Sequence, residues 1–253
     1  MTALDLRPAA APAPRSQRVI RHAMLEARLV VRNGEQLLLA LVIPLALIVG
    51  QRFLGPRLGI DTDTTVASVI ALGLWSTGFT SLAITTAFER RYGVLERLAA
   101  TPLRPLDLLL GKAAAMTALA TGQAAVLVVA GLAAGWAPHP DGWQSLVVVA
   151  TVPLALVAFA SFALALSGRG SAELTLGLAN LIYLLGAAAG LLVPPSLFPE
   201  WAQPVLACLP TTALAEALRA WATGVVQPWP VVVTLVWSIA GLLLARKAFR
   251  WTS

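Results

Sequence analysis

Residue types that carry out catalysis are few in this sequence, and their spacing does not suit it. The phosphate-binding pattern G-x-x-x-x-G-K-[ST] is absent, because Gly111-Lys112 is followed by Ala113 and lacks a glycine at the first position. There is no H-E-x-x-H zinc motif and no G-x-S-x-G serine elbow. The two histidines, His22 and His139, lie far apart and outside the long apolar segments. We therefore predict a chain with no catalytic residue and no metal site.

A second group of polar residues lies inside the apolar segments. Thr77, Thr80 and Ser81 follow one another at helical neighbour spacing, and Asn180 with Tyr183 lies in another segment. An asparagine is costly in lipid unless it faces protein or a cavity. Serine and threonine in such segments most often bond their own backbone or a neighbouring helix, and that alternative stays open. The other interpretation is that these five residues line a weakly polar translocation path.

The elements that must position these residues are membrane helices. Of the 253 residues, 58% are hydrophobic and 12% charged, where an ordinary soluble domain has roughly 25% charged residues. This composition excludes a disordered chain, a coiled coil and a disulfide-rich secreted domain. Six apolar segments are each near the roughly 20 residues that one crossing needs. We predict an all-α integral membrane protein with one transmembrane domain over residues 16–253 and spans at about 36–54, 66–88, 108–137, 143–167, 173–192 and 229–247.

The N-terminal region precedes the first span. Residues 1–15 are rich in proline and alanine and read as a disordered arm. Residues 16–33 form a predicted amphipathic helix, with Ser16 as a plausible N-cap and Arg21, Arg28 and Arg32 gathered on one side. Such a helix suits the membrane headgroup plane, and a soluble partner-binding helix is the alternative. We expect the first span to be retained as an uncleaved anchor.

The basic residues predict the orientation. All but three of the 18 Lys and Arg residues lie in connections on one side of the predicted spans. The exceptions are Arg52, Arg57 and Arg219. Because positive charge stays in the cytoplasm, we expect a multi-pass protein of the cytoplasmic membrane with both termini in the cytoplasm. With the net charge of +6, membrane lipids with anionic headgroups are an expected partner and nucleic acid is not.

Two connections are long enough for a function. In the cytoplasmic one, residues 89–107, a charged cluster precedes Gly93, and Val94–Ala100 is predicted as a short helix that Thr101-Pro102 ends. Its apolar side is suited to a groove on a soluble partner. In the external one, residues 193–228, the five prolines between positions 194 and 210 break the helix. There we expect two short helices, Glu200–Leu209 and Thr211–Ala222, that re-enter the membrane as a hairpin.

The cytoplasmic connection resembles that of ABC-2 permeases of ABC transporters, especially the daunorubicin and multidrug-exporter branch. The family pattern E-R-E-x-G-T-x-E-x-L-x-x-T-P-L is matched here at Glu89, Arg90, Gly93, Glu96, Leu98, Thr101, Pro102 and Leu103. Arg91 stands where an acidic residue is usual, and Val94 where a threonine is usual. The resemblance implies a coupling helix that docks on an ATPase subunit. The implied coupling residues are Glu89, Arg90, Arg91, Gly93, Glu96, Arg97, Leu98, Thr101 and Pro102.

The external connection resembles the same family. The pattern G-x-F-x-P-x-x-x-x-P-x-W-x-Q-x-x-x-x-x-x-P is matched by Gly190, Pro194, Pro199, Trp201, Gln203 and Pro210, with Leu192 at the aromatic position. The resemblance implies an efflux permease that moves an amphipathic drug or lipid-like substrate. It also implies a second permease chain, identical or homologous, and ATP and Mg²⁺ held by a separate ATPase subunit. The chain itself is then not an enzyme and binds no cofactor.

Three other functions stay open. An ion-coupled secondary transporter needs mid-membrane acids, and the nearest candidate, Glu173, lies beside Arg169 at the end of a span. A membrane-embedded lipid-modifying enzyme needs acids, histidines or metal ligands that the spans lack. A family member that scaffolds or immunises without transport would share every feature above.

Overall fold

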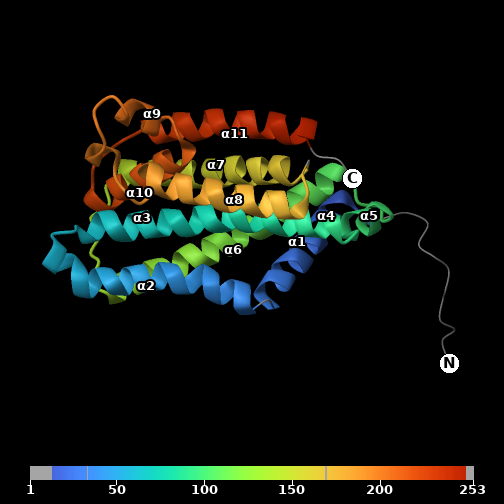
Figure 1. The fold of residues 1–253 in the computed structure, drawn as a ribbon, viewed down its shortest axis with the longest axis horizontal. Helices are drawn as coiled ribbons and strands as arrows, with labels where there is room; N and C mark the ends of the chain where they lie inside the picture. Colours follow the sequence, from blue (N-terminus) through green and yellow to red (C-terminus); the bar gives the residue numbers. More distant parts are fainter. Residues whose placement is uncertain (1–12, 33, 169, 249–253) are drawn as a thin grey trace.

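The described part of the protein is helical throughout. The computed structural model describes residues 13–32, 34–168 and 170–248, and these residues form helices and turns without a strand (Figure 1). The all-α fold class is therefore confirmed. The predicted N-terminal arm lies almost entirely outside the described residues, as do the basic residues Arg7, Arg169 and Arg250.

Six helical stretches in this part are long and apolar enough to cross a membrane, which agrees with the predicted number. The first is α2 (Gly34–Leu58). The second runs without a break through α3 (Thr62–Trp75), the π-helical segment η1 (Ser76–Ser81) and α4 (Leu82–Arg91). The others are α6 (Pro105–Ala133), α7 (Gly142–Ser167), α8 (Ala172–Gly186) with η2 (Ala187–Leu191), and α11 (Trp229–Ala248).

Five shorter or amphipathic elements complete the fold. They are α1 (Arg15–Arg32), α5 (Val94–Ala99), η3 (Pro195–Leu197), α9 (Gln203–Ala207) and α10 (Pro210–Thr223). α5 lies at one end of the bundle and α9 at the other (Figure 1), and we call these the α5 end and the α9 end.

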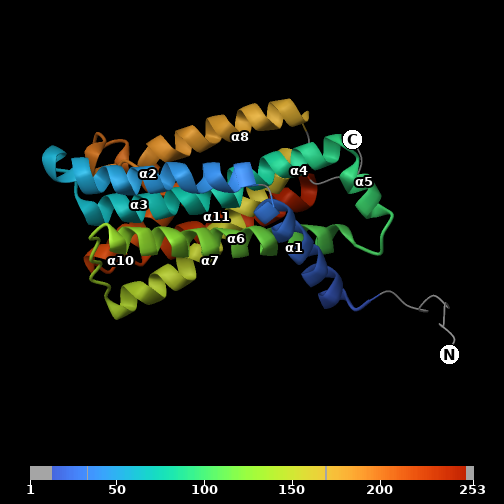
Figure 2. The ribbon, with the colours of Figure 1, turned by 90° about the horizontal axis from the view of Figure 1, so that it is seen from below.

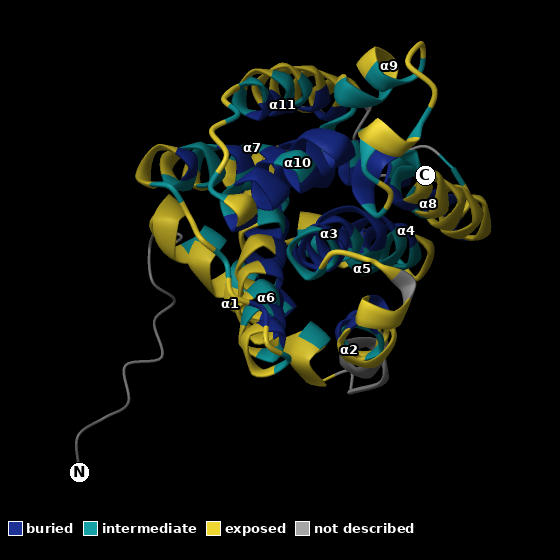
Figure 3. Ribbon diagram, turned by 90° about the vertical axis from the view of Figure 1, so that its left-hand side faces the viewer, coloured by how far each residue is buried: buried dark blue, intermediate teal, exposed yellow. Residues whose placement is uncertain are grey.

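The second stretch is the central helix of the bundle. Its residues Val66–Trp75 are all buried, because α2, α6, α7 and α10 surround it. α10 is the most buried of the short helices, and both α3 and α10 stand out as buried in Figure 3. α2, α8 and α11 instead leave many apolar side chains exposed. This distribution fits a bundle whose outer helices face lipid or another apolar partner.

The external hairpin differs in detail from the prediction. α9 covers only Gln203–Ala207, while α10 begins at Pro210, where proline favours the first helical turn. α10 then packs along α3 instead of lying on the outside of the bundle. Before the hairpin, the backbone leaves the helical region at Ala189 and Gly190, and Gly190 has φ of 91°. A left-handed backbone of this kind favours glycine.

α1 crosses α6 obliquely at the α5 end (Figure 2). The helix begins at Arg15, so the predicted N-cap Ser16 is wrong and already lies in the first turn. Its buried residues are polar, His22 and Glu26, whereas apolar Ile20 and Met24 are exposed. The amphipathic pattern is present, but α1 turns a polar strip toward α6. The reason is the ion pairs described below.

Candidate functional site

One cavity brings together four of the five residues predicted to line a path. It has a volume of about 230 Å³ and lies between α2, η1 and α8. Thr80 and Ser81 line it from η1, and Asn180 and Tyr183 line it from α8. Thr80 is buried, and its hydroxyl has no hydrogen-bond partner among the described residues. A buried hydroxyl without a partner is costly, so this cavity offers an unused polar group to a bound molecule.

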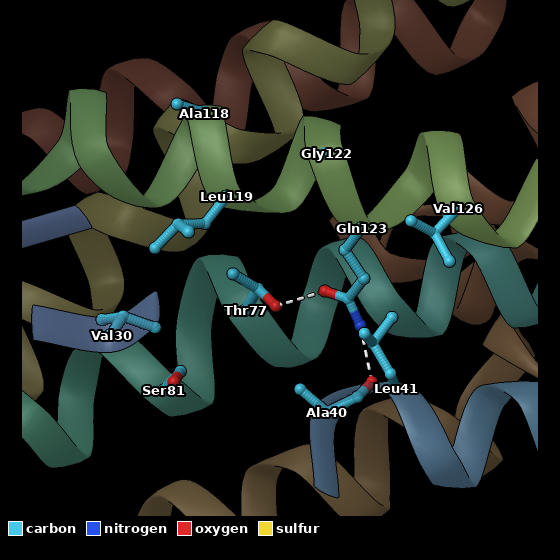
Figure 4. Close-up of a pocket in the computed structure, with 10 residues that line it drawn as sticks. All are labelled: Val30, Ala40, Leu41, Thr77, Ser81, Ala118, Leu119, Gly122, Gln123 and Val126. Carbon is cyan, nitrogen blue, oxygen red and sulfur yellow. Dashed lines mark hydrogen bonds between the residues drawn. The ribbon is translucent and has the colours of Figure 1, made fainter. Parts of the chain in front are cut away.

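Thr77, the fifth of these residues, faces a different cavity of about 240 Å³ between α1, α2, η1 and α6. Its hydroxyl donates to Gln123 Oε1 at 2.5 Å, and Gln123 Nε2 donates to the carbonyl oxygen of Ala40 at 2.8 Å (Figure 4). The remaining lining is mostly apolar. Gln123 on α6 therefore connects α6 to η1 and α2. Gln123 was not predicted as a functional residue, although an amide inside an apolar segment was the available signal.

The π-helical turn η1 explains why these hydroxyls point in two directions. A π turn has wider spacing than an α turn and shifts the register of the side chains that follow it. Here the turn coincides with Thr77, Thr80 and Ser81. Gly78 packs inside it against α7, and an added Cβ would lie 3.1 Å from Leu156 Cδ2. The two cavities consequently share Ser81 and lie on either side of the start of α2.

At the α5 end, Lys112 on α6 carries a fully buried charge. Its side chain has no exposed area and lies 2.8 Å from Glu26 Oε1 on α1 and 2.5 Å from Glu89 Oε2 on α4. One ammonium group thus joins three helices. Sequence reasoning assigned Lys112 to the positive-inside loop and Glu89 to a docking surface. The structure instead turns Glu89 into the bundle.

A second group of ion pairs connects α1 to the start of α6. Asp107, which is fully buried, accepts from Arg15 Nε at 2.7 Å and from Arg18 Nη2 at 3.2 Å. Arg18 Nη1 also donates to the carbonyl oxygen of Pro102 at 2.9 Å. Burial alone raises the free energy of a carboxylate, and the two guanidinium groups offset that cost. The loop after α5 is therefore tied to α1 as well as to α6.

The next two residues of the predicted coupling set also turn toward the protein. Arg90 donates to the carbonyl oxygen of Gly170, and Arg91 forms an ion pair with Glu173. Both contacts join α4 to the start of α8. A cavity of about 440 Å³ lies beside them, and Gly93 and Glu96 contribute to its wall.

The remaining coupling residues form the outer surface of α5 and its loop. Gly93 has φ of 68° and turns the chain into α5. Glu96, Arg97, Thr101 and Pro102 are exposed, and Leu98 is half-buried. Leu95 is 1% exposed, so the apolar side of α5 packs on the chain itself. Leu95 is therefore not available for insertion into a partner, and Glu96 and Arg97 give the free surface of α5 its charges.

His22 lies against the Lys112 cluster. Its Nε2 is 3.4 Å from Glu26 Oε1, and neither ring nitrogen has a hydrogen-bond partner among the described residues. Burial lowers the pKa of His22, and the neighbouring Glu26 carboxylate only partly opposes this. The neutral imidazole is thus favoured in the folded state.

Arg219 holds the kink at the α9 end. The sequence placed it in an external connection, yet only 6% of the residue is exposed. It donates to Ser68 Oγ at 2.7 Å, to the carbonyl oxygen of Gly190 at 2.7 Å and to that of Leu191 at 2.8 Å. Glu216 neutralises its charge. The guanidinium thereby satisfies the carbonyl groups that the broken helix leaves free. The residues described contain no cluster of three or more potential metal ligands.

The chain matches a model of a known protein family. Residues 61–245, well over half of the chain, match the family model described as "ABC-2 family transporter protein". The match begins just before α3 and includes α5, the α8–α10 kink and most of α11. No curated protein matches the chain.

Proposed function

The chain belongs to the ABC-2 transporter family, and on that premise we propose that it exports amphipathic drugs or lipid-like molecules. It does so as the permease subunit of an ATP-driven complex in the cytoplasmic membrane. The α5 end then faces the cytoplasm, together with both termini. The excess of basic residues in the connections supports this orientation. The multidrug-exporter branch remains part of the proposal and rests on the loop pattern at Glu89–Leu103.

The observation that carries the proposal is the continuity between α5 and the cavities. The polar surface of α5, formed by Glu96 and Arg97, is free for an ATPase subunit. α5 follows α4 after a single turn, and α4 continues directly into η1. η1 in turn supplies Thr77, Thr80 and Ser81 to the two cavities. A displacement of α5 therefore moves the element that shapes both cavities.

The mechanism needs two conformations that the ATPase distinguishes. ATP binding closes the ATPase subunits, and their contacts with α5 differ between the open and closed forms. That difference shifts the bundle between inward-facing and outward-facing states. Lys112, Asp107 and Glu173 hold α4, α5 and their loop to α1, α6 and α8, so these helices move with α5.

The lining of the cavity beside Asn180 supports an amphipathic substrate. Leu72, Ile43 and Ile84 give it an apolar wall, while Thr80, Asn180 and Tyr183 are its polar groups. Asn180 is exposed on a mostly apolar face of α8. A second permease chain packed against α2 and α8 would cover this face and enlarge the path, and that chain is either identical or homologous.

Association with an ATPase is the test of this proposal. The permease is co-expressed with candidate ABC ATPase subunits from the same genome and purified in detergent. We expect the ATPase to copurify, and we expect the double substitution Glu96→Lys with Arg97→Glu to remove it, because the two exposed charges are reversed. The exposed Arg57 at the other end of the bundle provides the control, Arg57→Glu. If the double variant retains the ATPase as well as the control does, α5 is not the docking element.

A further inference from the structure

An aromatic cavity separate from the proposed path is lined by Trp75. It has a volume of about 310 Å³ and is enclosed by α3, α7, α8, α10 and α11. Trp75, Phe159, Phe162 and Trp237 supply its rings. The Trp75 and Phe159 rings meet edge to face at 4.6 Å, and those of Phe162 and Trp237 do so at 5.4 Å. Two ring pairs thus form its walls.

The Trp75 indole brings an unused hydrogen-bond donor to this cavity. The residue is 5% exposed, and its Nε1 has no partner among the described residues. The other indole of the cavity behaves differently, since Trp237 Nε1 donates to the carbonyl oxygen of Cys208 at 2.7 Å. Buried indole N–H groups usually find a partner. Trp75 Nε1 is therefore a donor that the fold leaves for something else.

Gly186 packs closely against that donor. A Cβ added at Gly186 would lie 3.2 Å from Trp75 Nε1 and 3.4 Å from Thr211 Cγ2. Gly186, Trp75 and Thr211 all line the cavity. A side chain at position 186 would therefore crowd Nε1 and the cavity wall beside it.

The chemistry of the lining defines the ligand class. Apart from the unpaired indole N–H, the wall is made almost entirely of aromatic and aliphatic groups, and no charged residue is part of it. A charged ligand would lose its hydration without compensation there. An N–H donor repels a cation and attracts an oxygen acceptor. Flat rings stack or meet edge to face with the aromatic walls.

The cavity is reached from the lipid-facing side of the bundle. Leu185 and Ile182 on α8 line it and are 59% and 36% exposed. Both lie on a membrane-crossing helix. A molecule dissolved in the bilayer can therefore enter between α8 and α11 without crossing water.

We propose that this cavity binds a neutral, flat, apolar molecule through an acceptor oxygen that takes the hydrogen bond of Trp75 Nε1. The site is separate from the cavity at Asn180 and does not depend on an ATPase subunit. The binding proposal is therefore tested independently of the proposed transport function.

Photolabelling with benzophenone tests the site directly. Benzophenone carries two rings and one ketone oxygen, and irradiation attaches it to nearby C–H bonds. The purified chain in detergent is labelled, and the modified residues are located by mass spectrometry. We expect labels on cavity residues such as Ile182, Leu185 and Leu209. Competition then compares fluorenone with fluorene, which has the same rings but no oxygen. We expect fluorenone to compete about fivefold better, the effect of one buried hydrogen bond.

Two variants separate the hydrogen bond from the shape of the cavity. Trp75→Phe keeps a ring but removes the N–H, and should bring the fluorenone-to-fluorene ratio to about one. Gly186→Ala places a methyl group 3.2 Å from Nε1 and should do the same, while Gly177→Ala on the same helix is the control, because its Cβ would have no neighbour within 4 Å.

Three results would each overturn the proposal. The first is equal competition by fluorene and fluorenone in the unmodified chain. The second is labelling confined to residues outside the cavity. The third is displacement by dioctanoylglycerol as strong as that by fluorenone, which would assign the cavity to membrane lipid.

Discussion

At the residue scale, Lys112 is the side chain on which the α5 end depends. It is the one cation that lies within ion-pair distance of both Glu26 and Glu89 in the described residues. Removing its charge leaves two carboxylates facing each other in a buried position. The cost of breaking a buried pair in this way is roughly 3–5 kcal/mol.

We therefore predict that Lys112→Met lowers the thermal unfolding temperature of the purified chain markedly. Lys112→Arg, which retains the charge, should recover part of the loss. The matched control is Lys247→Met at the exposed end of α11, which should change little. Differential scanning calorimetry in one detergent measures all three. Equal unfolding temperatures for the two methionine variants would show that the ion pairs do not stabilise the fold.

His22 makes this region sensitive to acid. Because burial lowers its pKa in the folded state, the unfolded chain binds a proton first as the pH falls. The stability that the neutral imidazole contributes is fully present above the unfolded pKa of about 6.5 and is lost as the pH falls through it toward the folded pKa.

We predict that stability between pH 7.5 and pH 5.5 falls more steeply for the unmodified chain than for His22→Gln. The glutamine has no titratable group, so only the contribution of other residues remains. Unfolding temperatures measured across this range give the slope. Identical slopes for the two proteins would show that His22 does not contribute to the pH dependence of stability.

At the scale of elements, the sequence predicted the spans well but not their irregular parts. Long apolar segments between charged connections leave few alternatives, so the six spans could be predicted. No sequence pattern indicates the π turn at Ser76–Ser81, where Gly78 packs closely against α7. The prolines predicted a break of the helix after residue 192, but the kink at Ala189 and Gly190 lies inside the predicted span, and its anchoring by Arg219 was not predicted.

The charged residues of the coupling region show the same limit. A charge in a connection normally faces water or a partner, and Glu89, Arg90 and Arg91 were predicted to belong to the surface that docks on an ATPase subunit. Each instead pairs with a residue distant in the sequence, such as Lys112 or Glu173. Periodicity likewise predicted an amphipathic α1, but the choice of the buried face was made by Glu26 and its partner on α6. Local patterns do not contain these tertiary contacts.

The crossing of α1 and α6 depends on a close approach at Gly111. An added Cβ there would lie 2.5 Å from His22 Cδ2, which forces the ring to move. We predict that Gly111→Ala loosens α1 and increases hydrogen exchange over residues 15–32. Gly122→Ala on the same helix meets no neighbour within 4 Å and should leave that exchange unchanged. Equal hydrogen exchange over residues 15–32 in the two variants would contradict the close approach of α1 and α6 at Gly111.

At the scale of the whole molecule, ion pairs connect the helices of the permease around one irregular helix, the second span. The second span carries the π turn at its centre, faces both cavities, and leads into α5. The ion pairs of Lys112, Asp107 and Glu173 fasten the helices around its α5 end. The exposed apolar faces of α2 and α8 leave room for a second chain beside the proposed path.

We predict that the path residues affect transport more than folding. Asn180→Leu should leave the unfolding temperature nearly unchanged, because Asn180 is exposed, but should reduce transport of an amphipathic dye severalfold. Leu181→Ala, the neighbouring exposed position, is the control. Transport that is equally sensitive to both substitutions would argue against a path at this cavity.

ATP-driven uptake into inside-out membrane vesicles is the most direct test of the central claim. Vesicles containing the permease and the ATPase subunit that copurifies with it are given rhodamine 6G, an amphipathic dye. The account predicts uptake that requires ATP, requires both subunits, and is lost with the double substitution Glu96→Lys and Arg97→Glu. Uptake that persists without the ATPase, or that follows a proton gradient in the absence of ATP, would contradict it.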